Sequence, residues 1–232
     1  MEIKGSVALV TGANRGIGMA FTEALLAHGA AKVYAGVRDP KTALADGLTP
    51  LQLDVTDDEQ VAAAARAAQD VTIVVNNAGV TGGPTLMEGS LDGARREMEV
   101  NYFGTWAVSR AFAPVLAANG GGALVNMLSV ASWVANRRFP SYAASKSAQW
   151  SLTNAFRLAL REQGTLVLGV HAGYVDTDLA AEIDSPKIDA RDVAEAALTG
   201  VLNGDSEVLV DELTRRVRGG LSGSLEELYA NR

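Results

Sequence analysis

Short apolar runs alternate with longer helical patterns from the first residues of this chain almost to its last. The strand-like runs are Ser6–Thr11, Lys32–Gly36, Pro50–Leu53, Thr72–Asn76, Ala123–Leu128, Leu166–His171 and Glu207–Val210. Most are nearly continuous in apolar residues, which is typical of parallel strands buried on both faces. The alternation therefore predicts an α/β fold, a doubly wound parallel sheet of about seven strands flanked by helices.

The segments between these runs carry helical patterns. We expect helices at Gly16–Ala27, Asp57–Ala68, Leu91–Ala118, Tyr142–Gln163 and Ala190–Leu202, and a short amphipathic piece at Ser224–Ala230. Thr56 and Glu59 fit a capping box at one helix start, and Asp189 is placed to cap another. Pro114 is expected to kink the long helix that contains it.

Composition narrows both the architecture and the function. Of the 232 residues, 48% are apolar, which suits one domain spanning residues 1–232, and no repeat or linker divides the chain. The formal net charge of −7 argues against nucleic acid or an acidic membrane as a partner. The absence of cysteine excludes disulfides and thiolate chemistry, and His28 and His171 are too far apart in sequence to suggest a metal site.

The N-terminal residues lead directly into the first predicted strand. They lack the charged and apolar regions of a signal peptide, and no apolar run approaches the roughly 20 residues that span a bilayer. We therefore expect a soluble cytoplasmic protein with no membrane partner.

A glycine-rich turn follows the first strand, in the sequence Thr11-Gly12-Ala13-Asn14-Arg15-Gly16-Ile17-Gly18. Glycines permit a tight turn and close approach to a pyrophosphate, which the start of the next helix then stabilises. Alone, such a turn is also compatible with an ordinary strand-to-helix loop. Its spacing is TGxxxGxG and differs from the more widely quoted GxGxxG.

Two further motifs follow in order: Asn76-Asn77-Ala78-Gly79 after the fourth strand, and Tyr142-Ala143-Ala144-Ser145-Lys146 at a helix start. With the glycine turn, they resemble the short-chain dehydrogenase/reductase family, in its small single-domain branch. The resemblance covers roughly the first 180 residues. It implies a Rossmann-type domain that binds a nicotinamide dinucleotide, with a short substrate-loop segment near residues 178–188.

The resemblance also assigns residues to the cofactor. Asp54 and Val55 match the pair that contacts adenine, and Ala172-Gly173-Tyr174-Val175-Asp176-Thr177 is similar to a segment near the nicotinamide, with Ala172 where proline is usual. The implied cofactor-binding residues are Gly12, Asn14, Arg15, Gly16, Ile17, Gly18, Arg38, Asp54, Val55, Asn77, Ala78, Gly79, Tyr142, Lys146, Gly173, Val175 and Thr177.

The end of the second strand bears on the choice of cofactor. NAD enzymes often place an acidic side chain there against the ribose, whereas this chain has Arg38 followed by Asp39. Arg15 and Arg38 occupy the two basic positions suited to a 2′-phosphate, so we favour NADP(H) over NAD(H). Arg38 paired with Asp39, or Asp39 facing the ribose, would favour NAD(H).

Tyr142 and Lys146 lie four residues apart, hence on one face of a helix. A free tyrosine has a pKa near 10, and we expect the Lys146 ammonium to lower the Tyr142 pKa so that the phenol can exchange a proton while hydride moves at carbon. The resemblance completes a catalytic set of Asn101, Ser129, Tyr142 and Lys146. In it Ser129 orients the substrate oxygen, Lys146 also binds the nicotinamide ribose, and Asn101 holds a water beside Lys146. Ser132 competes with Ser129, and Asn101 is also compatible with a purely structural role in an irregular helix.

The expected reaction is NADPH-dependent reduction of a ketone or aldehyde. Oxidation of an alcohol, reduction of an imine or enoyl bond, and non-catalytic sensing of NADP(H) remain alternatives. A short substrate loop suggests a small to medium carbonyl compound, and the candidate pocket residues are Trp133, Arg137, Arg138, Phe139 and Tyr174. The exposed arginine pair is compatible with an anionic substrate or with simple solvation.

A homodimer or homotetramer is expected, through helices bearing Trp106, Phe112 and Trp150, although these residues equally suit core packing. The sequence after Val210 departs from the family pattern and leaves the second family contact in doubt.

Overall fold

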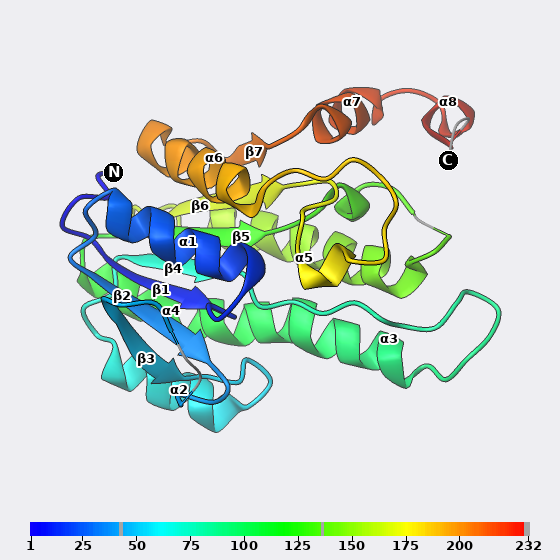
Figure 1. The fold of residues 1–232 in the computed structure, drawn as a ribbon. Coiled ribbons are helices and arrows are strands. Elements are labelled where there is room, and N and C mark those ends of the chain that lie inside the picture. The colour runs from blue at the N-terminus through cyan, green and yellow to red at the C-terminus, as the bar shows by residue number, and fades with distance from the viewer. Residues whose placement is uncertain (42–43, 136, 230–232) are drawn as a thin grey trace.

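The computed structural model describes residues 1–41, 44–135 and 137–229 (Figure 1). One seven-stranded sheet has the order β3-β2-β1-β4-β5-β6-β7, and every neighbouring pair is parallel. The strands are β1 (Val7–Thr11), β2 (Lys32–Val37), β3 (Leu48–Gln52), β4 (Ile73–Asn76), β5 (Ala123–Met127), β6 (Leu166–His171) and β7 (Glu207–Leu209). The predicted doubly wound parallel sheet is confirmed.

Helices connect successive strands except β2 and β3, and two more helices follow β7. They are α1 (Gly16–Ala27), α2 (Asp58–Ala67), α3 (Asp92–Glu97), α4 (Thr105–Ala118), α5 (Pro140–Ala159), α6 (Ala190–Asn203), α7 (Glu212–Gly220) and α8 (Leu225–Tyr229). Two single 3₁₀ turns, η2 (Val130–Ser132) and η3 (Asp178–Ala180), follow β5 and β6. The sequence did not predict α7, and the last residue of the predicted piece Ser224–Ala230 lies outside the described residues.

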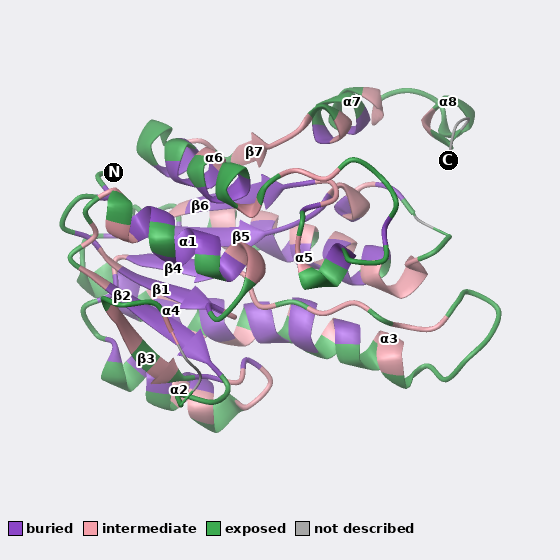
Figure 2. Cartoon of the chain, in the orientation of Figure 1, coloured by how far each residue is buried: buried purple, intermediate pink, exposed green. Residues whose placement is uncertain are grey.

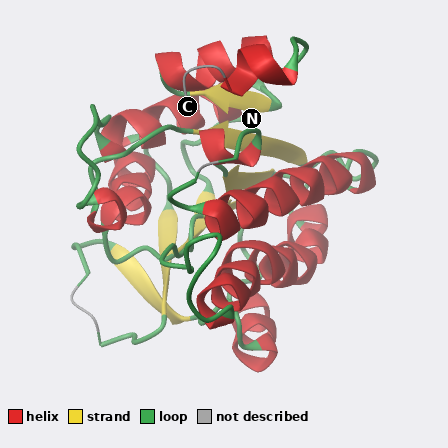
Figure 3. Ribbon diagram, turned by 90° about the vertical axis from the view of Figure 1, so that its right-hand side faces the viewer, coloured by secondary structure: helices red, strands yellow, loops and turns green. Residues whose placement is uncertain are grey.

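Helices cover both faces of the sheet, as Figures 1 and 3 show. On one face, Phe21 and Leu25 of α1 and Leu198 of α6 pack against the sheet. On the other face, α2, α4 and α5 enclose a second apolar cluster that includes Phe112 and Leu116. The five inner strands are buried almost throughout, whereas the edge strands β3 and β7 are partly exposed (Figure 2). This double cover explains why the strand sequences are continuously apolar.

The long helix expected at Leu91–Ala118 differs from the prediction. The helical run begins at Asp92 and widens to a π-helix, η1 (Met98–Gly104), before continuing as α4. The irregularity therefore lies at η1, while α4 runs through Pro114. A π-helix accommodates an additional residue in a turn and is frequent at functional sites.

The sequence predicts helix caps at two places, and the structure confirms one of them. Asp189 accepts a hydrogen bond from the Arg191 amide at 2.8 Å, as predicted. The predicted capping box of Thr56 and Glu59 is wrong. The Asp57 carboxylate caps α2 instead, because it accepts hydrogen bonds from the Glu59 and Gln60 amides. The Thr56 hydroxyl instead donates to Asp54, so this threonine belongs to the preceding loop.

Two kinds of feature are absent from the residues that the structure describes. None of their helices is long and apolar enough to cross a membrane. None of their histidine, aspartate or glutamate side chains gather in a group of three that could hold a metal ion.

Candidate active site

The turn between β1 and α1 is shaped by its glycines and by Asn77. Gly12 and Gly16 have φ values of 64° and 53°, a left-handed conformation that favours glycine. A Cβ on Gly18 would lie 2.1 Å from the Gly12 carbonyl oxygen, so no side chain fits there. The Asn77 amide donates to the carbonyls of Thr11 and Gly12, at 3.0 and 3.3 Å. The two motifs found in the sequence thus support each other directly.

A cleft of about 1130 Å³ opens beside this turn, at the carboxyl ends of β1, β2 and β4. Most residues predicted to bind the cofactor line it: Gly12, Asn14, Arg15, Gly16, Ile17, Arg38, Asp54, Val55, Asn77, Ala78, Gly79, Tyr142, Lys146 and Thr177. Gly18 is buried behind the turn, and Gly173 and Val175 line the neighbouring cavity instead. The glycine cradle and the size of the cleft fit a dinucleotide.

Positive side chains border the end of this cleft near β2. Arg38 lies there with Arg96, an arginine of α3 that the sequence analysis did not identify. Burial raises the Asp54 pKa, but hydrogen bonds from Thr56 and the charges of Arg96 and Arg38 lower it overall. Asp39 accepts a hydrogen bond from the Lys41 amide at 2.9 Å. Arg15 forms an exposed ion pair with Asp178 at 3.1 Å, so its predicted contact with a 2′-phosphate stays a prediction.

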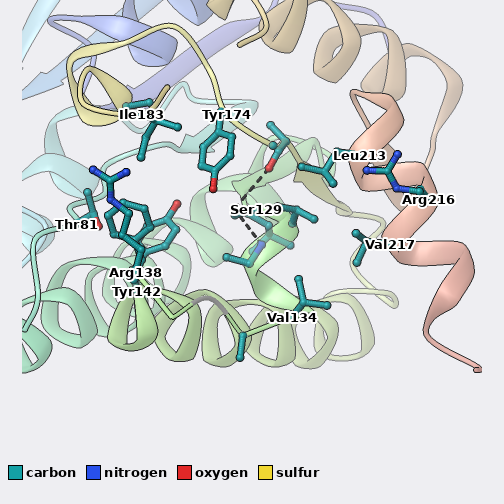
Figure 4. A pocket seen from close by; sticks show the side chains of 18 of the residues that line it. Thr81, Ser129, Val134, Arg138, Tyr142, Tyr174, Ile183, Leu213, Arg216 and Val217 are labelled. Carbon is teal, nitrogen blue, oxygen red and sulfur yellow. Dashed lines mark hydrogen bonds between the residues drawn. The ribbon is translucent and has the colours of Figure 1, made fainter. Parts of the chain in front are cut away.

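Tyr142 and Ser129 meet where the cleft joins a second cavity. Ser129 follows β5 and is only 8% exposed, and Tyr142 lies in the first turn of α5. Figure 4 shows both side chains, together with the Tyr174 hydroxyl, directed into one space. Ser132 does not compete for this position, because its hydroxyl accepts the Ser129 amide at 3.3 Å and closes the η2 turn.

The protonation of Tyr142 differs from the expectation. Burial raises the Tyr142 pKa to about 12, an interaction with the Ser129 hydroxyl opposes the rise, and the negative charge of Glu97 adds to it. The expected lowering by Lys146 is therefore not seen. Burial also lowers the Lys146 pKa, to about 7. At neutral pH, Tyr142 is a phenol that can donate a proton.

Lys146 is held in place by a chain of buried hydrogen bonds. Its ammonium, 5.8 Å from the centre of the Tyr142 ring, donates to the Met127 carbonyl and to Gln149 Oε1, both at 2.8 Å. The Gln149 amide donates to the Thr105 hydroxyl, which donates to the Asn101 carbonyl, again at 2.8 Å each. Gln149 was missed in the sequence, although it lies three residues after Lys146 on the same face of α5.

Asn101 lies in the π-helix η1 and is completely buried. Its side chain accepts the Val80 amide and donates to the Val80 carbonyl, both at 2.9 Å, and also donates to the Ser145 hydroxyl. The side chain thus ties η1 to the loop after β4 and to α5. This geometry supports the structural role, while the water that the family resemblance implies beside Lys146 stays a prediction.

Glu97, which precedes Asn101 by one helical turn, is a buried carboxylate near Tyr142. It is only 2% exposed, and its Oε1 accepts the Gly83 amide at 3.0 Å. Its Oε2 is buried without a hydrogen-bond partner among the described residues. Charged residues are rarely buried in this way outside functional sites. The sequence alone does not give this signal, because it does not show which face of α3 is buried.

The second cavity has a volume of about 1480 Å³ and a largely apolar lining. All the predicted pocket residues except Trp133 line it, and Trp133 instead stacks on the buried His171 ring beneath η2, with ring centres 3.8 Å apart. One wall of this cavity was not predicted from the sequence: it is formed by α7 and α8, with Leu213, Val217 and Tyr229. The Tyr229 hydroxyl accepts the Ala135 amide at 3.0 Å and attaches this wall to the loop after η2.

A dinucleotide cleft that opens onto an apolar pocket through a tyrosine, a serine and a lysine defines a nicotinamide-dependent oxidoreductase. The family model for short chain dehydrogenases matches residues 6–188. The chain belongs to the short-chain dehydrogenase/reductase family and is an NAD(P)-dependent oxidoreductase.

Individual relatives resemble the chain over nearly its full length. A short chain dehydrogenase from Burkholderia cenocepacia J2315, solved in complex with NADP, is 40% identical, covers 99% of this chain and 98% of its own, and superposes with a TM-score of 0.94. An uncharacterized oxidoreductase of Staphylococcus saprophyticus is 30% identical over 93% of this chain and 99% of its own. The 1-deoxy-11-beta-hydroxypentalenate dehydrogenase of Streptomyces exfoliatus is 32% identical over 94% of this chain and 87% of its own.

Proposed function

We propose that the protein reduces a ketone or aldehyde to an alcohol with NADPH. The observation that carries this proposal is the position of Tyr142 beside Ser129, between the nucleotide cleft and the apolar pocket. A phenol with a pKa of about 12 is a proton donor at neutral pH, and reduction of a carbonyl needs a donor at oxygen.

Each residue of the site has a separate role in the proposed reduction. A bound reduced nicotinamide supplies the hydride that goes to the carbonyl carbon. Ser129 donates a hydrogen bond that orients the carbonyl oxygen, and Tyr142 transfers its proton to that oxygen as the alcohol forms. Lys146, which donates hydrogen bonds to the Met127 carbonyl and to Gln149, would bind the ribose of the cofactor. The apolar walls exclude water from the reacting groups.

Loss of NADPH absorbance with a panel of ketones and aldehydes tests the reaction. Tyr142→Phe should lower kcat by a factor on the order of 100 or more while NADPH binding is retained, because it removes only the proton donor. The buried Tyr34 lies in β2, and its hydroxyl donates to Asp70, which precedes β4 at the amino end of the sheet, so Tyr34→Phe is the control variant. Full activity of Tyr142→Phe would overturn the role of Tyr142 as proton donor, whereas no turnover of any carbonyl compound by the wild type would favour a sensing role.

Preference for NADP(H) is part of the proposal. Arg38 lines the adenosine end of the cleft, Asp39 is engaged with Lys41, and the 40% identical Burkholderia protein was solved with NADP. Arg38→Ala should raise the KM for NADPH about tenfold and leave that for NADH nearly unchanged, because only NADPH has the 2′-phosphate. An equal rise for both cofactors would contradict this preference.

We also propose a homo-oligomer that pairs through η1 and α4. Phe103 and Trp106 are 49% and 41% exposed there, whereas Phe112 is a core residue and Trp150 is half-buried. Exposed aromatic side chains favour burial against a partner. Sedimentation of the wild type and of Trp106→Glu tests this, with dissociation of the variant as the expected result.

A further inference from the structure

The second cavity combines an apolar lining with an excess of positive charge. Three arginines border it, Arg137, Arg138 and Arg216, against the single carboxylate of Glu227. The whole chain, by contrast, carries a formal net charge of −7. A cationic lining in an acidic protein attracts anions to this pocket.

Of the three arginines of α7, only Arg216 lines the cavity. Arg215 bonds the Glu212 carboxylate at 3.3 Å, and Arg218 bonds Glu207 at 3.2 Å. Arg216 lies between them in sequence, and no hydrogen bond or ion pair reaches its guanidinium from the part of the chain that the structure describes. On the opposite wall, Arg138 already donates to the Glu182 carbonyl and lies over the Phe139 ring.

The space between Arg216 and the reactive hydroxyls is apolar. Figure 4 shows Arg216 extending from α7 on one side of the cavity, Tyr142 on the other, and Ser129 between them. Leu213, Val217 and Val134 lie on the side of Ser129 that faces Arg216. A molecule with its carbonyl at Ser129 would therefore meet an apolar surface first and a guanidinium beyond it.

We propose that the substrate is an oxo acid, with an apolar body between its carbonyl and a carboxylate, and that Arg216 binds the carboxylate. A guanidinium pairs with a carboxylate through two parallel hydrogen bonds, which suits recognition of the end of a substrate. This inference rests on the proposed carbonyl reduction and names its substrate class.

The test compares each oxo acid with its own methyl ester, over a series in which the chain between carbonyl and carboxylate lengthens. The wild type should have a kcat/KM about tenfold higher for the acid than for the ester at the best length, and less at high salt. Arg216→Gln should remove this preference through KM and leave the rate with the ester unchanged. Arg216→Lys should retain part of it.

Arg161→Gln is the matched control, because Arg161 is exposed in the turn before β6, at the opposite end of the sheet, and its loss changes the net charge equally. Esters reduced as well as acids, or an acid preference that survives in Arg216→Gln, would overturn the oxo-acid proposal while the reductase function stands. Failure to reduce acid and ester alike, at every chain length and with neutral ketones, would instead overturn the reductase function.

Discussion

The nucleotide cleft and the substrate pocket lie side by side but are built differently. The cleft is formed by the carboxyl ends of buried strands and by a turn whose backbone is bonded directly to Asn77. The pocket is walled by short elements, η2, η3, α7 and α8, that join the sheet only at their ends. The cleft therefore tolerates almost no change of shape, whereas the pocket can be altered without disturbing the cleft.

Substitution of a glycine should show the largest difference between the cleft and the pocket wall. Gly18→Ala places a Cβ 2.1 Å from a backbone oxygen, so we expect the melting temperature to fall by about 5 °C or more and NADPH affinity to fall on the order of 100-fold. Gly219→Ala in α7 meets no atom within 4 Å and should leave both unchanged. Calorimetric binding and thermal melts measure the pair. Equal effects of the two substitutions would mean that the two regions do not differ in rigidity.

The second prediction concerns the buried hydrogen bonds behind the cleft. Gln149→Leu removes one hydrogen bond each from Lys146 and Thr105, which keep only their bonds to the Met127 and Asn101 carbonyls, and this should destabilise the fold by about 1–3 kcal/mol and lower kcat about tenfold. Gln163→Leu, which removes hydrogen bonds to Ala113 and Thr165 far from the cleft, is the control. Both variants should lose stability, and only the first should lose kcat at a temperature where each is folded.

A smaller effect is expected from the charge of Glu97. Because this carboxylate raises the Tyr142 pKa, Glu97→Gln should lower that pKa and move the alkaline limb of carbonyl reduction to lower pH, with a few-fold loss of rate at alkaline pH. Glu99→Gln, at an exposed position two residues later, should leave the profile unchanged. Identical profiles for wild type and Glu97→Gln would show that Glu97 does not act on the proton donor.

The smallest expected effect is on the stability of the fold at acid pH, through the carboxylate of Glu207. The His171 ring, 3.6 Å away, and then Trp150 and Arg218 lower the Glu207 pKa to about 2, against the effect of burial. A carboxylate whose pKa is lower in the folded state stabilises the fold above its unfolded pKa of about 4.5, and this contribution is lost as pH falls towards 2.

Denaturant unfolding between pH 2 and 7 checks this behaviour. Glu207→Gln should be less stable than the wild type at pH 7 by about 1–2 kcal/mol, after allowance for solvent screening, and the two should converge at low pH. Curves that stay parallel across this range would contradict a role for Glu207 ionisation.

The same contrast explains how far the sequence predicts the molecule. The glycine turn, Asn77 and the Tyr142–Lys146 pair are local patterns with fixed spacing, so they place the sheet and the cleft. Glu97 and Gln149 have ordinary helical neighbours, and their roles depend on which helix face is buried. The pocket wall formed by α7 and α8 depends on a contact between Tyr229 and Ala135. These residues are 94 positions apart in the sequence, so no periodic pattern predicts their contact.

The π-helix η1 makes the length of one segment critical. Deleting a single residue within Met98–Gly104 would let the wide turn close to ordinary α-helical spacing while α3 and α4 keep their register on either side. The helix would survive, but Asn101 would be displaced from its hydrogen bonds to Val80 and Ser145. The exposed loop at residues 85–90 just upstream carries no such register, so insertions among related enzymes should gather there and avoid η1.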